Sequence, residues 1–171
     1  MRELEIHGKA VEIKFNYNFY SRLMEEAQSK QNKKDSSQTV DGFNQLIEGL
    51  VDQDPGAIVT AYRAAVVGKT RPTRADVEQA LDEAGIWDTE NPFNDLYKEL
   101  QSVGFLRLKV QHLLQLLQEE VVTAKTALEA MQETANKSKE SKEEVKQARN
   151  GVVLAQKTYE MAKNFIDNLS K

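Results

Sequence analysis

The sequence predicts a mainly α-helical fold that begins with a small β-hairpin, continues as a domain of short helices and ends in two long helices. The first fifteen residues alternate apolar and polar side chains, which is the period of a β-strand. Short helical segments with recognisable start and stop residues follow, as far as Gly104. Beyond Gly104, two long apolar stripes continue with no proline to interrupt them. We therefore expect two domains, residues 1–108 and residues 109–171.

The N-terminal alternation predicts two strands joined by a turn at Gly8 and Lys9. A two-stranded hairpin of this kind is only marginally stable by itself in water. Its apolar face is therefore expected to pack on helices or on another subunit. The apolar positions of the hairpin are Leu4, Ile6, Val11, Ile13 and Phe15.

Three successive helices have both of their ends marked in the sequence. Asp54 can cap a helix whose first position is Pro55, where the missing N–H costs nothing. Thr73 and Asp76 have the spacing of a capping box, and Asn91-Pro92 repeats the first pattern. The glycines expected to end these helices are Gly68, Gly85 and Gly104.

The segment VVGKT, Val66 to Thr70, resembles the end of the phosphate-binding loop of nucleotide hydrolases. That loop needs an earlier glycine at the position where this chain has Arg63. The loop also follows a strand, whereas the residues before Gly68 have helical spacing, and Pro72 disfavours a helix directly after the segment. We therefore interpret VVGKT as the end of a helix and expect no nucleotide site.

The first long stripe advances in helical steps of mostly three and four residues, and residues 133–144 after it have no large apolar side chain. A heptad pattern then starts at Val145. The two stripes suit either an antiparallel helical hairpin or a coiled coil between subunits, and Asn150-Gly151 is the one point at which the second helix could break. The residues of the first stripe are Leu106, Val110, Leu113, Leu117, Val121, Ala124, Leu128 and Met131.

The heptad positions after residue 144 form a narrow seam of the coiled-coil type. Its residues are Val145, Ala148, Val152, Ala155, Tyr159, Ala162, Ile166 and Leu169. We expect the protein to self-associate as a homo-oligomer through Ala148, Val152, Ala155, Tyr159, Ala162 and Ile166 of this seam.

The sequence offers no candidate for catalysis, for a cofactor or for a metal. There is no cysteine, and the two histidines, His7 and His112, lie far apart in a strand and on a long helix. Trp87 lies between two helices and is interpreted as a core residue. A net charge of −4 gives no electrostatic case for nucleic acid, and no apolar run has the roughly 20 residues needed to span a membrane. We expect a non-enzymatic protein with no nucleic acid or membrane partner.

The order of elements resembles the tail assembly chaperones of long-tailed phages that infect Gram-positive bacteria. The opening ELEIHGKAVEIKFNYNF is similar to the start of that family, a hairpin followed by a helix with an aromatic beginning. PTRADVEQALDEAG and NPFNDLYKELQSVGFL are similar to its central and closing helices. The resemblance covers about residues 1–110, and the long helices that follow lie outside it.

The resemblance implies a chaperone that binds and solubilises the tape measure protein and helps to recruit tail tube subunits around it. It implies a location in the host cell cytoplasm and absence from the mature virion. The alternative is a structural coiled-coil adaptor or tail component that stays in the assembly. For the contact with a partner helix we expect Leu113, Leu114 and Leu117, unless these leucines only pack against the second stripe.

Overall fold

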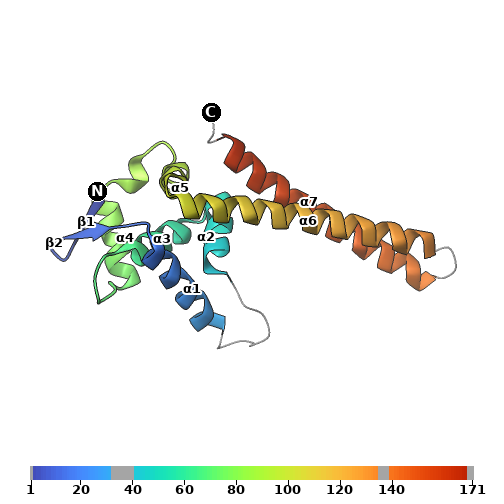
Figure 1. Cartoon of the computed structure of the whole chain (residues 1–171), viewed down its shortest axis with the longest axis horizontal. Helices are drawn as coiled ribbons and strands as arrows, with labels where there is room; N and C mark the ends of the chain where they lie inside the picture. Colours follow the sequence, from blue (N-terminus) through green and yellow to red (C-terminus); the bar gives the residue numbers. More distant parts are fainter. Residues whose placement is uncertain (1, 32–40, 135–138, 169–171) are drawn as a thin grey trace. The chain divides into compact units, whose positions relative to one another are not determined.

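A computed structural model describes residues 2–31, 41–134 and 139–168 of the chain. It divides into two compact units, Met1–Arg107 and Leu108–Lys171, which are described separately below. The fold is mainly α-helical with a two-stranded antiparallel hairpin at the start and two long helices at the end, which confirms the predicted fold class (Figure 1). The elements in chain order are β1 (Arg2–Ile6), β2 (Lys9–Ile13), α1 (Tyr17–Gln31), α2 (Gly42–Val51), α3 (Pro55–Ala65), α4 (Arg74–Glu83), η1 (Ile86–Asp88), α5 (Pro92–Ser102), α6 (Gly104–Thr134) and α7 (Lys139–Asn168).

The hairpin turns at His7 and Gly8, one residue earlier than predicted, and Lys9 already pairs with Ile6. Both turn residues have positive φ, 53° and 70°. A two-residue turn with this geometry matches the right-handed twist of the flanking strands. A turn at His7-Gly8 is therefore favoured over one at Gly8-Lys9. The hairpin therefore needs the glycine at its second turn position.

The apolar face of the hairpin is covered by helices of the same chain. Leu4, Ile6 and Ile13 are buried, and α4 packs against β1. At the other edge, the chain after α3 lies along β2: the Val67 N–H donates to the Glu12 carbonyl over 2.8 Å. Packing on helices is thus the arrangement that stabilises this otherwise marginal hairpin.

The predicted helix starts are confirmed. The Asp54 side chain accepts a hydrogen bond from the N–H of Gly56 over 2.8 Å, with Pro55 in the first turn of α3. Thr73 and Asp76 form both bonds of a capping box. Asn91 caps α5 through the N–H of Asn94.

Only one of the three predicted glycine ends is confirmed. Gly85 follows α4 in the left-handed conformation, with φ 65°. Gly68 does not cap α3, because α3 ends at Ala65 and the extended Val66 turns to pair with β2 instead. Gly104 is not a cap either: α5 ends at Ser102, and Gly104 is already the first residue of α6.

The core of the first unit is built from aromatic and aliphatic side chains of the hairpin and the short helices. The Phe15 ring meets Phe19 edge-on, with centroids 5.1 Å apart, and Tyr62 at 5.9 Å. Such edge-to-face pairs add to the stability that burial provides. The largest fully buried side chains of this unit are Phe19, Leu23, Phe43, Ile47, Leu50, Ile58, Tyr62, Leu81, Leu96, Tyr97, Leu100 and Leu106.

The second unit is an antiparallel pair of helices, α6 and α7, that pack together (Figure 1). Of the two arrangements that the sequence left open, the structure therefore has the helical hairpin within one chain. The helix α7 runs without interruption through Asn150 and Gly151. Residues 135–138, within the segment that lacks large apolar side chains, are outside the described part of the chain. None of the described helices combines the length and the apolar character that a membrane span requires.

Candidate partner-binding surfaces

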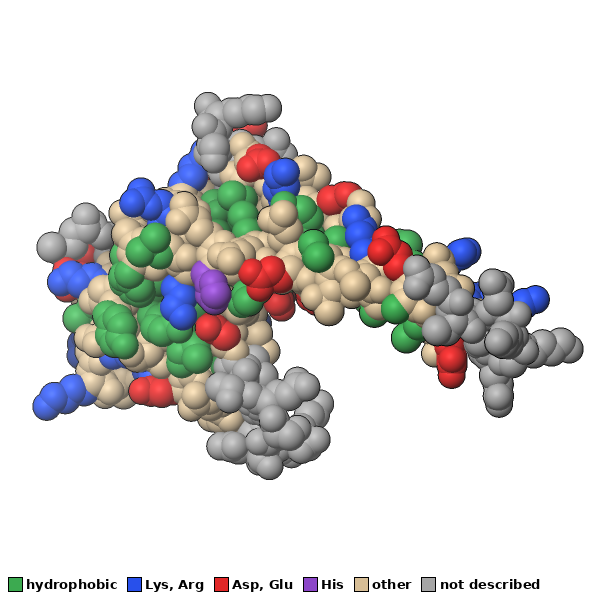
Figure 2. All heavy atoms as spheres, turned by 45° about the vertical axis from the view of Figure 1, so that its right-hand side comes forward, with side chains coloured by type: hydrophobic (Ala, Val, Ile, Leu, Met, Phe, Trp, Pro, Cys, Tyr) green, Lys and Arg blue, Asp and Glu red, His purple; other side chains and the backbone are tan. Residues whose placement is uncertain are grey.

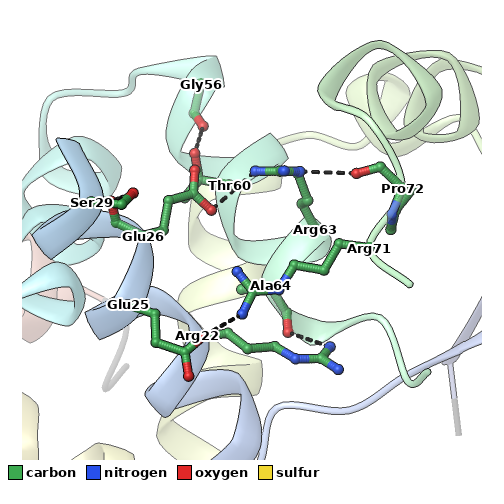
Figure 3. A network of polar contacts seen from close by, with 10 residues as sticks. All are labelled: Arg22, Glu25, Glu26, Ser29, Gly56, Thr60, Arg63, Ala64, Arg71 and Pro72. Carbon is green, nitrogen blue, oxygen red and sulfur yellow. Dashed lines mark hydrogen bonds and ion pairs between the residues drawn. The ribbon is translucent and has the colours of Figure 1, made fainter. Parts of the chain in front are cut away.

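The VVGKT segment is held by an arginine of α1, Arg22, whose hydrogen bond to the preceding Ala64 carbonyl is drawn in Figure 3. The Arg22 guanidinium donates hydrogen bonds to the backbone carbonyls of Ala64, Val66 and Gly68, the last over 2.6 Å. A cation is favourable at this position because the last carbonyls of a helix have no partner within the helix. The segment therefore serves as a structural junction between α1, α3 and β2.

Arg63, which occupies the glycine position of a phosphate loop, belongs to the same structural network (Figure 3). Its guanidinium binds the Glu26 carboxylate at 3.1 Å and the Pro72 carbonyl at 3.0 Å. Arg71 binds Glu25 at 2.7 Å. These arginines are engaged by the protein itself, so the network links α1 to the chain between α3 and α4.

The two histidines do not come together. His7 lies at the tip of the β1–β2 hairpin, where its Nε2 is 3.1 Å from Asp76 Oδ1. Hydrogen bonds from Thr73, and to a smaller extent the proximity of His7, hold the pKa of Asp76 below its ordinary value. His112 is exposed on α6. Within the described residues, no group of three or more histidine or carboxylate side chains is placed to hold a metal ion.

The three leucines proposed from the sequence for partner binding lie on or beside the covered side of α6. Leu113 is buried, with 5% of its surface exposed, and Leu114 and Leu117 are half-buried. The large apolar residues exposed on α6 lie mostly outside the predicted stripe. They are Leu108, Leu116, Val122 and Met131, of which only Met131 belongs to that stripe.

The seam of α7 is likewise on the covered side of its helix. Val152 and Ala162 are buried, and Ala148, Ala155, Tyr159 and Ile166 are half-buried. These residues pack in the hairpin that α7 forms with α6. On the outer sides of α7, three apolar residues are exposed instead: Val153, Leu154 and Met161.

The exposed apolar residues of the long helices alternate with charged side chains, as the face drawn in Figure 2 shows. Leu154 and Val153 have about two thirds of their surface exposed, 67% and 66%. These residues are separate apolar side chains on several sides of the two helices, set in a highly charged surface. Exposed side chains spread along long helices suit the binding of a long partner better than the enclosure of a small molecule.

The first unit also has an aromatic patch at its surface. Tyr17 at the start of α1 has 68% of its surface exposed, and its ring lies 6.1 Å from Tyr20 and 6.0 Å from Phe105. Tyr20 and Phe105 also contact each other, with centroids 6.3 Å apart. Exposed aromatic side chains are frequent in protein interfaces because they bury a large area at a small cost in side-chain entropy.

One comparison with known proteins identifies a family. A family model described as phage tail assembly chaperone protein, TAC, matches residues 3–115. This match covers nearly all of the first unit and the beginning of α6. Neither a curated protein nor a solved structure matches the chain.

Proposed function

The chain belongs to the phage tail assembly chaperone family, and from this membership we propose that it binds and solubilises the tape measure protein during tail assembly. We further propose that it helps to recruit tail tube subunits. It would act in the host cell cytoplasm and be absent from the mature virion. Its role is to hold partners through surfaces, without catalysis.

The observation that carries the proposal is the family match, and the surface of the long helices supports it. The α6–α7 hairpin leaves apolar side chains such as Leu116, Leu154 and Met161 in solvent. A long amphipathic helix presents apolar residues three and four positions apart, so it can contact several of these side chains along the hairpin. Many weak contacts along a repetitive partner then act together, because each one raises the local concentration for the next.

We propose that the exposed residues make the first contact with the partner helix. Leu113, Leu114 and Leu117 remain the sequence-based proposal for the contact, but Leu113 is buried and Leu114 and Leu117 are half-buried. We propose that a partner reaches them by displacing α7 from α6. An exchange of this kind would replace one helix by another of similar amphipathic character.

The proposed self-association through the α7 seam also requires α7 to leave its partner helix α6. Because Ala148, Val152, Ala155, Tyr159, Ala162 and Ile166 pack inside the hairpin, they can join two copies only if α7 of one copy packs on α6 of another. Such an exchange of identical elements is a known route to dimers at low cost.

Co-expression with the tape measure protein tests the proposed function. The partner should stay soluble with the intact protein and aggregate without it. The double variant Leu116→Asp with Leu154→Asp should lose this effect while its helix content is unchanged, because both side chains are exposed. Gln118→Asp with Gln147→Asp, at exposed polar positions of the same helices, is the matched control and should keep it.

Equal insolubility of the tape measure protein with and without the chain would contradict the chaperone function. Mature particles decide between the chaperone and a structural adaptor that is retained in the tail. A chaperone should be missing from purified particles, whereas an adaptor should be present in stoichiometric amounts.

A further inference from the structure

A groove on the first unit lies between the start of α3, the helix α4 and η1. It is open to solvent and has a volume of about 500 Å³. Val59 lies at its base, and Pro55 and the half-buried Trp87 line it with apolar surface. Glu78 and Asp82 line it from α4, as does Arg74. We call this site the Trp87 groove.

Among the residues that the structure describes, two polar groups of the Trp87 groove have no partner. In the described part of the chain, neither the Asp82 carboxylate nor the Trp87 indole N–H makes a hydrogen bond or an ion pair. Glu78 is different, since it pairs with Arg74 at 2.8 Å. A carboxylate beside a half-buried indole is a favourable place for a cation, which the carboxylate attracts and the indole face also stabilises.

The chain around the Trp87 groove is strongly acidic. Between Arg74 and Asp95 there are seven carboxylates and one cation, Arg74 itself, although the net charge of the whole chain is only −4. A surface with this charge selects a cationic partner and repels an acidic one. The occupant should therefore combine lysine or arginine with one apolar side chain.

The helix α7 presents such a combination on one of its exposed sides. Lys142, Lys146, Arg149, Val153 and Lys157 follow one another at steps of four, three, four and four residues, so they share one side of the helix. All five are exposed, and Val153 is 66% exposed among the cations. We call these residues the α7 basic stripe.

We propose that the α7 basic stripe of one copy of the protein docks in the Trp87 groove of a second copy. Val153 then packs on Trp87 and Pro55, and Arg149 pairs with Asp82. Lys146 lies one turn from Arg149, as Glu78 lies one turn from Asp82, so Lys146 and Glu78 can pair in register. They do so by exchanging their exposed partners within the chain, Glu143 for Lys146 and Arg74 for Glu78. The contact goes beyond the proposed chaperone function, because it needs no tail protein.

The docking joins two different surfaces of the protein, so the assembly can grow beyond a dimer. Each copy keeps one groove or one stripe free after the first contact, so further copies add head to tail until the ring closes or a filament grows. The hairpin stays intact in this contact, unlike in an exchange of α7. Because charge pairs contribute to the contact, salt should weaken it.

The full-length protein provides the test through sedimentation at increasing concentration. In low salt we expect reversible association beyond a dimer, and in about 1 M salt, where the Debye length is about 3 Å, we expect it to weaken. Asp82→Lys inactivates the groove and Arg149→Glu inactivates the stripe. Each reversal should weaken association at least about tenfold, because it places like charges opposite each other.

A mixture of the two variants gives the sharpest result. The Arg149→Glu copy has an intact groove and the Asp82→Lys copy has an intact stripe, so they should form one good contact. The stripe and groove left free carry the reversed charges at positions 149 and 82, which also complement each other, so the mixture should recover association that each variant alone has lost. Glu120→Lys and Lys163→Glu, exposed charges outside both surfaces, are the matched controls and should associate like the parent protein.

Several outcomes would overturn the proposed contact. A protein that is monomeric at every concentration would do so, and so would a mixture that associates no better than each variant alone. Association that survives each reversal on its own would assign it to other surfaces, such as the α7 seam. Circular dichroism must show that the variants are folded, and Val153→Asp, at an exposed position, gives a second and independent way to remove the contact.

Discussion

Gly42, the first residue of α2, lies directly against the backbone of Leu23 in α1. A Cβ atom on Gly42 would be 2.2 Å from the Leu23 carbonyl oxygen, which is far inside van der Waals contact. The close approach lets Phe43 and Leu46 of α2 enter the core beside α1. The crossing of these two helices therefore depends on the absence of a side chain.

Gly42→Ala should destabilise the first unit. Overpacking costs about 1–3 kcal/mol, and we expect the upper end because the obstacle is backbone, which cannot rotate away as a side chain does. Urea unfolding of the full chain measures the loss. Gly104→Ala is the control, because no atom lies within 4 Å of its added Cβ, and it should change stability by less than about 0.5 kcal/mol.

Gly151→Ala should have the opposite effect. Gly151 is exposed inside the uninterrupted helix α7, and its added Cβ would meet no atom within 4 Å. Alanine in a helix interior is favoured over glycine by about 0.5–1 kcal/mol, so the helical hairpin should melt at a higher temperature. A lower melting temperature in circular dichroism would show that α7 needs to bend at this residue.

Arg22→Met should destabilise the junction that contains VVGKT. The substitution keeps apolar bulk but leaves the carbonyls of Ala64, Val66 and Gly68 without their donor. Hydrogen bonds to a charged group contribute about 1.5–3 kcal/mol, so denaturant unfolding should show a loss of this size. Arg71→Met removes only a partly exposed ion pair with Glu25 and should cost about 0–1 kcal/mol. Equal losses for the two variants would contradict the role given to Arg22.

Ala155→Arg should disrupt the α6–α7 hairpin, because Ala155 lies on the covered side of α7. A long charged side chain cannot be accommodated there without separating the helices. Far-UV circular dichroism should therefore show less helix or a lower melting temperature. Leu154→Arg introduces the same side chain at the preceding position, which is 67% exposed, and should leave the helix content unchanged.

The capping box of α4 should make stability depend on pH on the acid side. The pKa of Asp76 is lowered in the folded state by hydrogen bonds from Thr73, so its carboxylate stabilises the fold above the unfolded-state pKa of about 4. This contribution is lost as the pH falls through the lower folded-state pKa. Asp76→Asn should be less stable than the parent at neutral pH; the difference should begin to shrink below about pH 4 and disappear once the pH is below the lowered folded-state pKa.

Unfolding midpoints in urea at a series of pH values measure this convergence. Glu129→Gln, at an exposed position of α6, is the control and should follow the parent at every pH. A constant difference between Asp76→Asn and the parent down to strongly acidic pH would contradict the role of the ionised carboxylate.

The sequence alone determined the features that depend on near neighbours in the chain. The caps at Asp54, Thr73 and Asn91 were predictable because the side chain and the N–H groups it binds lie within three residues. The covered side of α7 was predictable because a heptad repeat places Val152 and Ala162 on one side of any helix. Composition by itself excluded thiol chemistry, because the chain contains no cysteine.

Tertiary structure decided the features that depend on backbone hydrogen bonds between segments distant in sequence. Val66 had helical spacing, but it leaves α3 because β2 offers its backbone hydrogen bonds and Arg22 binds the carbonyls around it. The hydrophobic pattern alone cannot show this, because the partners lie more than forty residues away. The Trp87 groove is of the same kind: α3, α4 and η1 form it only after they pack, and Trp87 alone carries no sign of it. Helix caps and hydrophobic periodicity depend on residues that are close in sequence. A groove or a strand pairing depends on residues that are distant in sequence and come together only on folding.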